Sequence, residues 1–145
     1  MIEINKFIKQ FTDKKIPNIQ KNGREYFLVE LEQEKLSKEI DKEIFSKGIL
    51  LGEMKKRFKP SPALIDLLAK LSNRKAFITK DAEWLFLCGR DVFESSIVKK
   101  NVDEGVVLVQ NERDENLGFG LLEKKKGRFM IKNILDKGAY LRSKN

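Results

Sequence analysis

Histidine is absent from the 145 residues of the sequence, and cysteine occurs once, as Cys88. The lack of imidazole excludes Ser-His-Asp hydrolysis, Cys-His proteolysis and His-ligated zinc within this sequence. A single cysteine supports neither an internal disulfide nor a cysteine-rich metal site, which suits a reducing cytoplasm. We therefore expect a cytoplasmic protein without a metal or other cofactor, in which Cys88 is a buried structural thiol.

Proline and glycine are also scarce, at 3 and 9 residues, which excludes collagen-like and low-complexity chains. No apolar run approaches the roughly 20 residues that cross a bilayer. The first ten residues carry charges in every short window and so differ from a secretory signal. These features predict a globular protein away from membranes, built as one domain or as two of about 70 residues each.

Motifs for catalysis are missing as well. No Walker phosphate-binding loop is present, and Leu117–Gly120 lacks the third glycine of a dinucleotide fingerprint and lies in a predicted strand. The carboxylates that could serve as acids or bases cannot be paired from their spacing; they are Asp13, Asp66, Asp91 and Asp136. We predict a protein that binds without catalysing a reaction, since a stand-alone enzyme would need a carboxylate pair that the sequence does not reveal.

Positive charge is what the sequence has in abundance. The chain has 30 lysines and arginines against 22 acidic residues, a net charge of +8, and an isoelectric point near 9.5. This balance favours a polyanionic partner such as a nucleic acid, and the alternative is a solvated lysine-rich surface, because 23 of the 30 are lysines. Residues 1–72 and 73–145 each hold 15 basic and 11 acidic residues, so net charge does not single out either half.

Two local clusters of basic residues do stand out. The first consists of Lys55, Lys56, Arg57 and Lys59, and the second of Lys124, Lys125, Lys126, Arg128 and Lys132. In the second cluster Arg128 and Lys132 alternate along a predicted strand, so they share one face beside a lysine-rich turn. Such a surface can follow a phosphate backbone, although a solvated turn is the simpler interpretation.

Aromatic residues are the second requirement for binding single-stranded RNA, because bases stack on them. Phe58 lies inside the first cluster, where stacking and core packing are about equally plausible. Phe129 lies inside the second cluster but faces opposite Arg128, which favours core packing. Trp84, the single tryptophan, is predicted to anchor the core from a short helix.

Hydrophobic spacing and turn residues predict the elements of the N-terminal half. They are a helix holding Ile4, Phe7, Ile8 and Phe11, a hairpin of 16–21 and 24–29 with a type I′ turn at Asn22-Gly23, a surface helix at Gln33–Phe45, a strand at Ile49–Met54, and a helix from Pro62 to about Leu71. Ser61 is the predicted N-cap of that last helix. We place a domain boundary after it, between residues 72 and 73.

The C-terminal half reads as a small barrel of short strands with one helix. The predicted elements are a strand at 75–79, a helix from Lys80 to Leu87 capped by Thr79, short strands at 92–93, 97–98, 106–110, 117–122 and 128–131, and a last strand at 138–141. Two glycines, Gly118 and Gly120, share one face of their strand. This spacing predicts that another group packs very close to the strand's backbone.

The stretch from Lys75 to Arg142 resembles a PUA domain, a small RNA-binding pseudo-barrel. The matching segments are 76–79 with 81–83, 87–92, 104–109, 117–120 and 136–142. The whole chain resembles, more loosely in its N-terminal half, the archaeal form of the Nip-seven family of ribosome-biogenesis factors. It departs from the PUA pattern at Asp81, where a glycine commonly stands, and its loops near Asn22 and Lys124 are short.

This resemblance implies an α+β fold, in which an N-terminal α/β pre-PUA domain (1–72) precedes a C-terminal PUA pseudo-barrel (73–145). It implies an RNA-binding factor of large-subunit biogenesis or rRNA processing, which binds single-stranded, U-rich segments of rRNA or pre-rRNA, with pre-ribosomal proteins or the exosome as protein partners. We further expect a monomer. The implied RNA contacts are Lys125, Lys126 and Lys132, with Arg128 beside them. We expect the cluster of Lys55, Lys56, Arg57 and Lys59 to assist if the two domains face the same way.

Two other functions fit the same residues. In the first, the chain is a protein adaptor that docks on an assembly factor through the helix at Gln33–Phe45. In the second, it is the RNA-recognition subunit of an RNA-modifying or RNA-degrading complex whose catalytic chain is separate.

Overall fold

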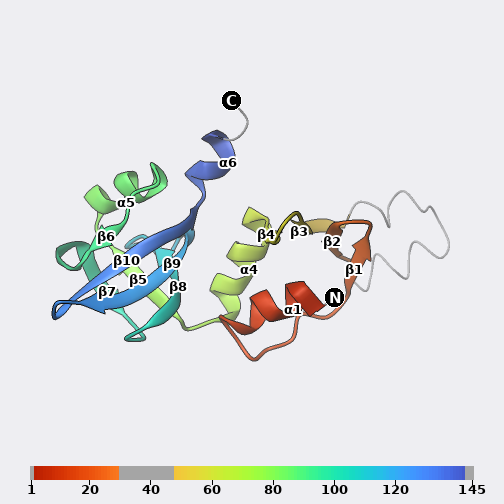
Figure 1. Cartoon of the computed structure of the whole chain (residues 1–145), viewed down its shortest axis with the longest axis horizontal. Coiled ribbons are helices and arrows are strands. Elements are labelled where there is room, and N and C mark those ends of the chain that lie inside the picture. The colour runs from red at the N-terminus through yellow and green to blue at the C-terminus, as the bar shows by residue number, and fades with distance from the viewer. Residues whose placement is uncertain (1, 30–47, 143–145) are drawn as a thin grey trace.

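The computed structural model describes residues 2–29 and 48–142, and the predicted helix at Gln33–Phe45 lies outside them. The N-terminal elements are α1 (Ile2–Lys9), β1 (Ile19–Asn22), β2 (Glu25–Leu28), β3 (Ile49–Met54), β4 (Phe58–Pro60) and α4 (Pro62–Leu71). The C-terminal elements are β5 (Lys75–Ile78), α5 (Lys80–Leu87), β6 (Val92–Phe93), a 3-10 turn (Glu94–Ser96), β7 (Ile97–Lys100), β8 (Gly105–Gln110), β9 (Asn116–Lys125), β10 (Arg128–Asp136) and α6 (Gly138–Arg142). The mixed α+β fold is therefore as predicted, and Figure 1 shows the two halves side by side. No helix within the described ranges is long and apolar enough to span a membrane.

The N-terminal sheet has the antiparallel order β1-β2-β3-β4. Its predicted hairpin is confirmed, but the type I′ turn at Asn22-Gly23 is wrong. Asn22 still pairs with Glu25 in the ladder, so the two turn residues are Gly23 and Arg24. Of these, only Gly23 has a positive φ, at 64°. The turn thus lies one residue further along the chain than the sequence indicated.

The two N-terminal helices are confirmed, and the side chains at their ends fix them. The Ser61 hydroxyl accepts a hydrogen bond from the Leu64 amide at 3.2 Å, and Pro62 occupies the first turn of α4. At the other end of α4, the Ser72 hydroxyl donates to the Phe11 carbonyl at 2.6 Å. Helices α1 and α4 are thereby held together just before the chain enters the C-terminal half.

The C-terminal sheet has the order β6-β10-β9-β8-β5-β7. Strand β5 runs parallel to β8, and the other pairs are antiparallel. The close approach predicted at the glycines is confirmed, because a Cβ at Gly120 would lie 2.5 Å from the Lys132 carbonyl of β10. The group that packs there is the backbone of the neighbouring strand, and β10 carries a bulge between Asn133 and Leu135.

The predicted last strand at 138–141 is wrong, since Gly138–Arg142 is the helix α6. The buried Asp136 carboxylate accepts a hydrogen bond from the Ala139 amide at 2.9 Å, as an N-cap does. Arg142 contacts the same carboxylate at 3.2 Å and donates to the Leu87 carbonyl at 2.6 Å. The contact with Leu87 comes from a distant part of the sequence, whereas the Asp136 cap is a local signal that the strand prediction overlooked.

The two halves share one hydrophobic cluster. Leu108 and Phe119 of the C-terminal sheet are buried with the core residues of α1, α4 and the N-terminal sheet. The Phe119 ring centroid lies 5.5 Å from those of both Phe7 and Phe11. An ion pair between Lys137 and Asp66 joins the halves at the surface. The relative placement of the two halves is therefore set by packed side chains.

Candidate nucleic-acid interface

The second basic cluster lies at the tip of the β9–β10 hairpin. Lys125 pairs with Arg128 across the ladder, which leaves Lys126 and Gly127 as a two-residue turn. Both turn residues have positive φ, 52° and 77°, as in a type I′ turn. Lys125, Lys126 and Arg128 are all exposed, and Lys132 is exposed further along β10. The structure thus brings the predicted residues of this cluster onto one hairpin.

Few acidic groups compete for these cations. Lys125 lies 3.6 Å from Glu123 in an exposed pair, and such pairs contribute about 0–1 kcal/mol. Lys126, Arg128 and Lys132 form no ion pair within residues 2–29 and 48–142. The hairpin therefore presents positive charge that a polyanion can use.

A groove of about 700 Å³ adjoins the hairpin tip, and we term it the tip groove. It is lined by Phe93, Glu94, Ser95, Lys125, Lys126, Arg128, Phe129 and Met130. Phe93 is 65% exposed and pairs with Met130 across β6 and β10. Phe93 was not predicted as part of the site. Successive side chains of a strand point to opposite faces, so the burial of Val92 places Phe93 on the exposed face. The groove combines cations with an exposed aromatic ring.

Phe129 packs against the C-terminal core, as predicted. Its ring also attracts lysines, because the ammonium groups of Lys100 and Lys124 lie 4.0 and 5.3 Å from the ring centroid. Lys124 is therefore turned toward Phe129, whereas Lys125, Lys126 and Arg128 line the groove. Within the cluster, these three are the best placed to contact a ligand there.

The first basic cluster lies at the turn between β3 and β4, where Lys55, Lys56 and Arg57 are exposed, and Lys59 on β4 is half-buried. Phe58, which stands among them, packs against the N-terminal core with its ring 5.4 Å from Phe7 and 5.6 Å from Tyr26. The turn borders Ile134 and Leu135 at the end of β10, whereas the tip groove lies at the start of that strand. The structure does not merge the two clusters into one patch.

Two predictions made for α5 are wrong. Trp84 is 70% exposed, and Cys88 at the end of the helix is also exposed. The cause is the narrow apolar face of α5, which buries Ala82 and Phe86 at i and i+4. Trp84 lies midway between them in sequence and therefore points away from the core.

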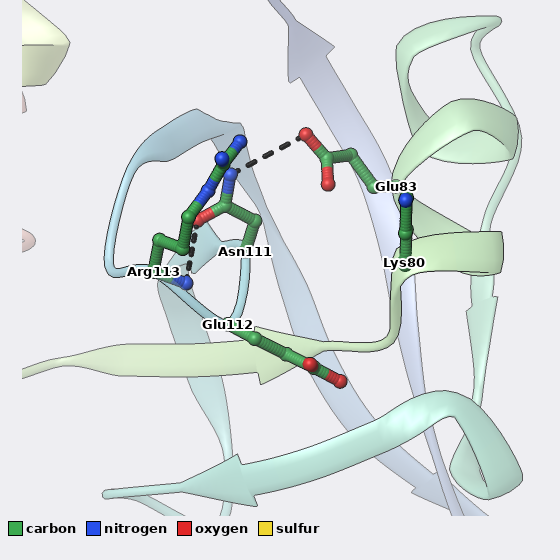
Figure 2. A pocket seen from close by; sticks show the side chains of 5 residues that line it. All are labelled: Lys80, Glu83, Asn111, Glu112 and Arg113. Atoms are coloured by element: carbon green, nitrogen blue, oxygen red, sulfur yellow. Dashed lines mark hydrogen bonds between the residues drawn. The ribbon is translucent and has the colours of Figure 1, made fainter.

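A smaller hollow of about 260 Å³ is lined by Lys80, Glu83, Asn111, Glu112 and Arg113 (Figure 2). The Asn111 side chain accepts from the Arg113 amide at 2.9 Å and donates to Glu115 at 2.9 Å. The hydrogen bond from Asn111 holds the pKa of Glu115 below its usual range. These groups hold their own loop in place, and the mixed charges of the hollow are poorly suited to binding a polyanion.

No three His, Cys, Asp or Glu side chains in the described part of the chain could together hold a metal ion.

Comparison with known proteins identifies the fold of the C-terminal half. The model of the UPF0113 PUA domain family matches residues 74–145. This half has the PUA-domain fold. A UPF0113 protein of Archaeoglobus fulgidus is 30% identical over 105 residues, which are 66% of this chain and 60% of that relative. This chain thus matches less than two thirds of the length of that relative.

The fold extends beyond the PUA domain to the whole chain. A solved structure described as a conserved PUA domain protein from Thermoplasma acidophilum matches 97% of this chain and 91% of its own, with a TM-score of 0.54. The sequence identity is 13%, so this likeness concerns the fold alone. It confirms the predicted architecture, in which an N-terminal α/β domain precedes the PUA domain.

Proposed function

We propose that this protein binds single-stranded RNA at the tip groove and catalyses no reaction. The observation that carries the proposal is that Lys125, Lys126 and Arg128 line the same groove as the exposed ring of Phe93. Cations that follow the backbone, together with an aromatic platform for bases, are what single-strand binding requires. PUA domains generally bind RNA, which supports the same function.

We further propose that the RNA is rRNA or pre-rRNA and that the protein acts in the cytoplasm, as a monomer, during large-subunit biogenesis. The support is the resemblance of the whole chain to the Nip-seven family, which also suggests U-rich segments as ligands and pre-ribosomal proteins or the exosome as partners. The segment Asp136–Arg142 belongs to that resemblance, and it anchors α6 to the PUA sheet through the Asp136 carboxylate.

The test is a fluorescence-anisotropy titration with a fluorescein-labelled ten-nucleotide oligouridylate. The double variant Lys125→Glu/Lys126→Glu is expected to weaken binding by one to two orders of magnitude, about 1–1.5 kcal/mol per lost contact. Because Lys126 has a positive φ, Lys126→Asn serves as a second variant, which removes the charge with a residue that tolerates this conformation. The slope of affinity against salt should also flatten by about one to two units.

The matched control is Lys14→Glu/Lys15→Glu, which changes the net charge equally at two adjacent exposed lysines of the N-terminal half. An equal loss of affinity in both double variants would show that only overall charge matters. Unchanged binding by the Lys125→Glu/Lys126→Glu variant would refute the assignment of the site.

A further inference from the structure

A larger groove, of about 870 Å³, lies between the two halves of the chain, and we term it the interdomain groove. Apolar residues from both halves line it, namely Phe7, Phe58, Val106, Phe119, Ile134 and Leu135. The Phe7 ring lies 5.4 Å from Phe58 and 5.5 Å from Phe119, so the lining includes a continuous aromatic cluster. Its volume lies within the range of small-molecule sites, about 300–1,000 Å³.

The rim of the interdomain groove is positively charged. Lys55, Lys56, Arg57 and Lys59 all line it, and no acidic side chain does so among the described residues. Lys55 lies 3.6 Å from Glu53, whereas Lys56 and Arg57 form no ion pair in the described part of the chain. This charge complements phosphate and disfavours a cationic ligand.

Strand β10 connects the interdomain groove to the tip groove. Arg128, the first residue of β10, lines the tip groove, and Ile134 and Leu135 near its end line the interdomain groove. The six steps of strand from Arg128 to Ile134 span about 20 Å. Lys132 is exposed between them. Figure 1 shows β10 running from the free hairpin tip to α6, near the N-terminal half.

We propose that the interdomain groove is a second RNA subsite, which takes an unpaired nucleobase among its aromatic residues. The cluster of Lys55, Lys56, Arg57 and Lys59 would hold the flanking phosphates, and Lys132 would contact the strand between the two grooves. Unpaired bases splay out and pack on aromatic side chains when proteins read single-stranded RNA. The inference rests on the proposed function, because the same RNA strand occupies both grooves.

The proposal predicts that a longer RNA gains affinity through the interdomain groove, and that groove variants lose this gain. A four-nucleotide oligouridylate fits one groove, whereas a twelve-nucleotide one reaches both, within the about 4–16 nucleotides that small single-strand-binding domains cover. The quantity to measure is the ratio of the two affinities, by anisotropy with fluorescein-labelled oligonucleotides. Lys56→Glu/Arg57→Glu is expected to reduce this ratio at least about tenfold, as removal of about one phosphate contact does.

A second variant tests the apolar part of the groove. Ile134 is 49% exposed, so Ile134→Asp places a carboxylate beside the base with little loss of core packing. It should also reduce the ratio. The matched control is Val98→Asp, at a residue that is 57% exposed and lines neither groove, and it should leave the ratio unchanged. Thermal melts of all variants verify that each one folds.

The outcomes separate the inference from the proposed function. If wild-type protein binds the longer RNA and Lys125→Glu/Lys126→Glu weakens it, but the ratio stays unchanged in both groove variants, the second subsite is refuted and the RNA function stands. A groove that serves a protein partner instead would give this same result. If wild-type protein binds neither oligonucleotide, the proposed function itself fails.

Discussion

The hydroxyl of Tyr140 donates a hydrogen bond of 2.6 Å to the carbonyl of Pro60, and so ties helix α6 to strand β4 of the other half. Lys59, next to Pro60, lies with its ammonium 5.8 Å from the Tyr140 ring centroid. This contact adjoins the rim of the interdomain groove, which Lys59 and Pro60 line. The tyrosine therefore helps to hold the β3–β4 turn against the PUA domain.

Stability at high pH should report on this tyrosine. Burial raises the pKa of Tyr140 from 10.0 to about 12. An unfolded chain loses the phenolic proton first, so the contribution of Tyr140 to stability is complete below pH 10 and is lost as the pH rises through about 12. Urea unfolding between pH 9 and 12 is expected to show a smaller decline in Tyr140→Phe than in the wild type.

At neutral pH the same variant lacks the hydrogen bond to Pro60, and its free energy of unfolding should fall by about 0.5–1.5 kcal/mol. All other groups are the same in both proteins, so the difference between the two curves isolates Tyr140. Parallel curves across the alkaline range would contradict the raised pKa of this half-buried hydroxyl.

A second pH effect is expected in acid, at Asp114. Its pKa is lowered from 3.8, chiefly by the hydrogen bond from Gln110 at 3.0 Å and then by Lys75 at 3.1 Å. Because the folded state favours the carboxylate, the stabilisation is present above pH 3.8 and is lost as the pH falls below that value. Thermal melts from pH 2.5 to 6 should show a shallower acid decline for Asp114→Asn, which suits the residue's φ of 60°. An unchanged decline would show that the Gln110 contact does not form in solution.

Phe93 provides the sharpest test of the tip groove. Removal of a stacking ring costs about 1–3 kcal/mol of binding free energy, so Phe93→Ala should weaken oligouridylate binding by about 5-fold to 150-fold. Phe93→Tyr keeps the ring and should retain most of the affinity. Since the side chain is 65% exposed, neither variant should change the melting temperature much. Equal affinities for the alanine variant and the wild type would exclude stacking on Phe93.

Local sequence patterns were sufficient to predict most of the helices and strands. The N-caps at Ser61 and Thr79 were located correctly because a cap involves only the next few residues. The same holds for the basic hairpin, where Lys125 precedes a tight turn and Arg128 follows it. These features depend on short stretches of chain, which a sequence displays directly.

Long-range packing explains what the sequence did not reveal. Phe93 joins the basic cluster only because β6 pairs with β10, where Phe93 and Met130 are 37 positions apart in the numbering. The interdomain groove forms only because Phe7 and Phe119, from different halves, pack in the same hydrophobic core. Both associations depend on how whole elements pack, and hydrophobic spacing within one element carries no information about that.

The exposure of Trp84 leads to a prediction that needs no substitution. Trp84 is the single tryptophan of the sequence, so the intrinsic fluorescence of the folded protein reports this one ring. With 70% of the residue exposed, the emission should resemble that of a hydrated indole, and iodide and acrylamide should quench it strongly. Unfolding in urea should therefore shift the emission maximum only slightly. A blue-shifted, poorly quenched emission would mean that the ring is covered in solution, as it would be if the face of α5 that carries Trp84 packed against another surface.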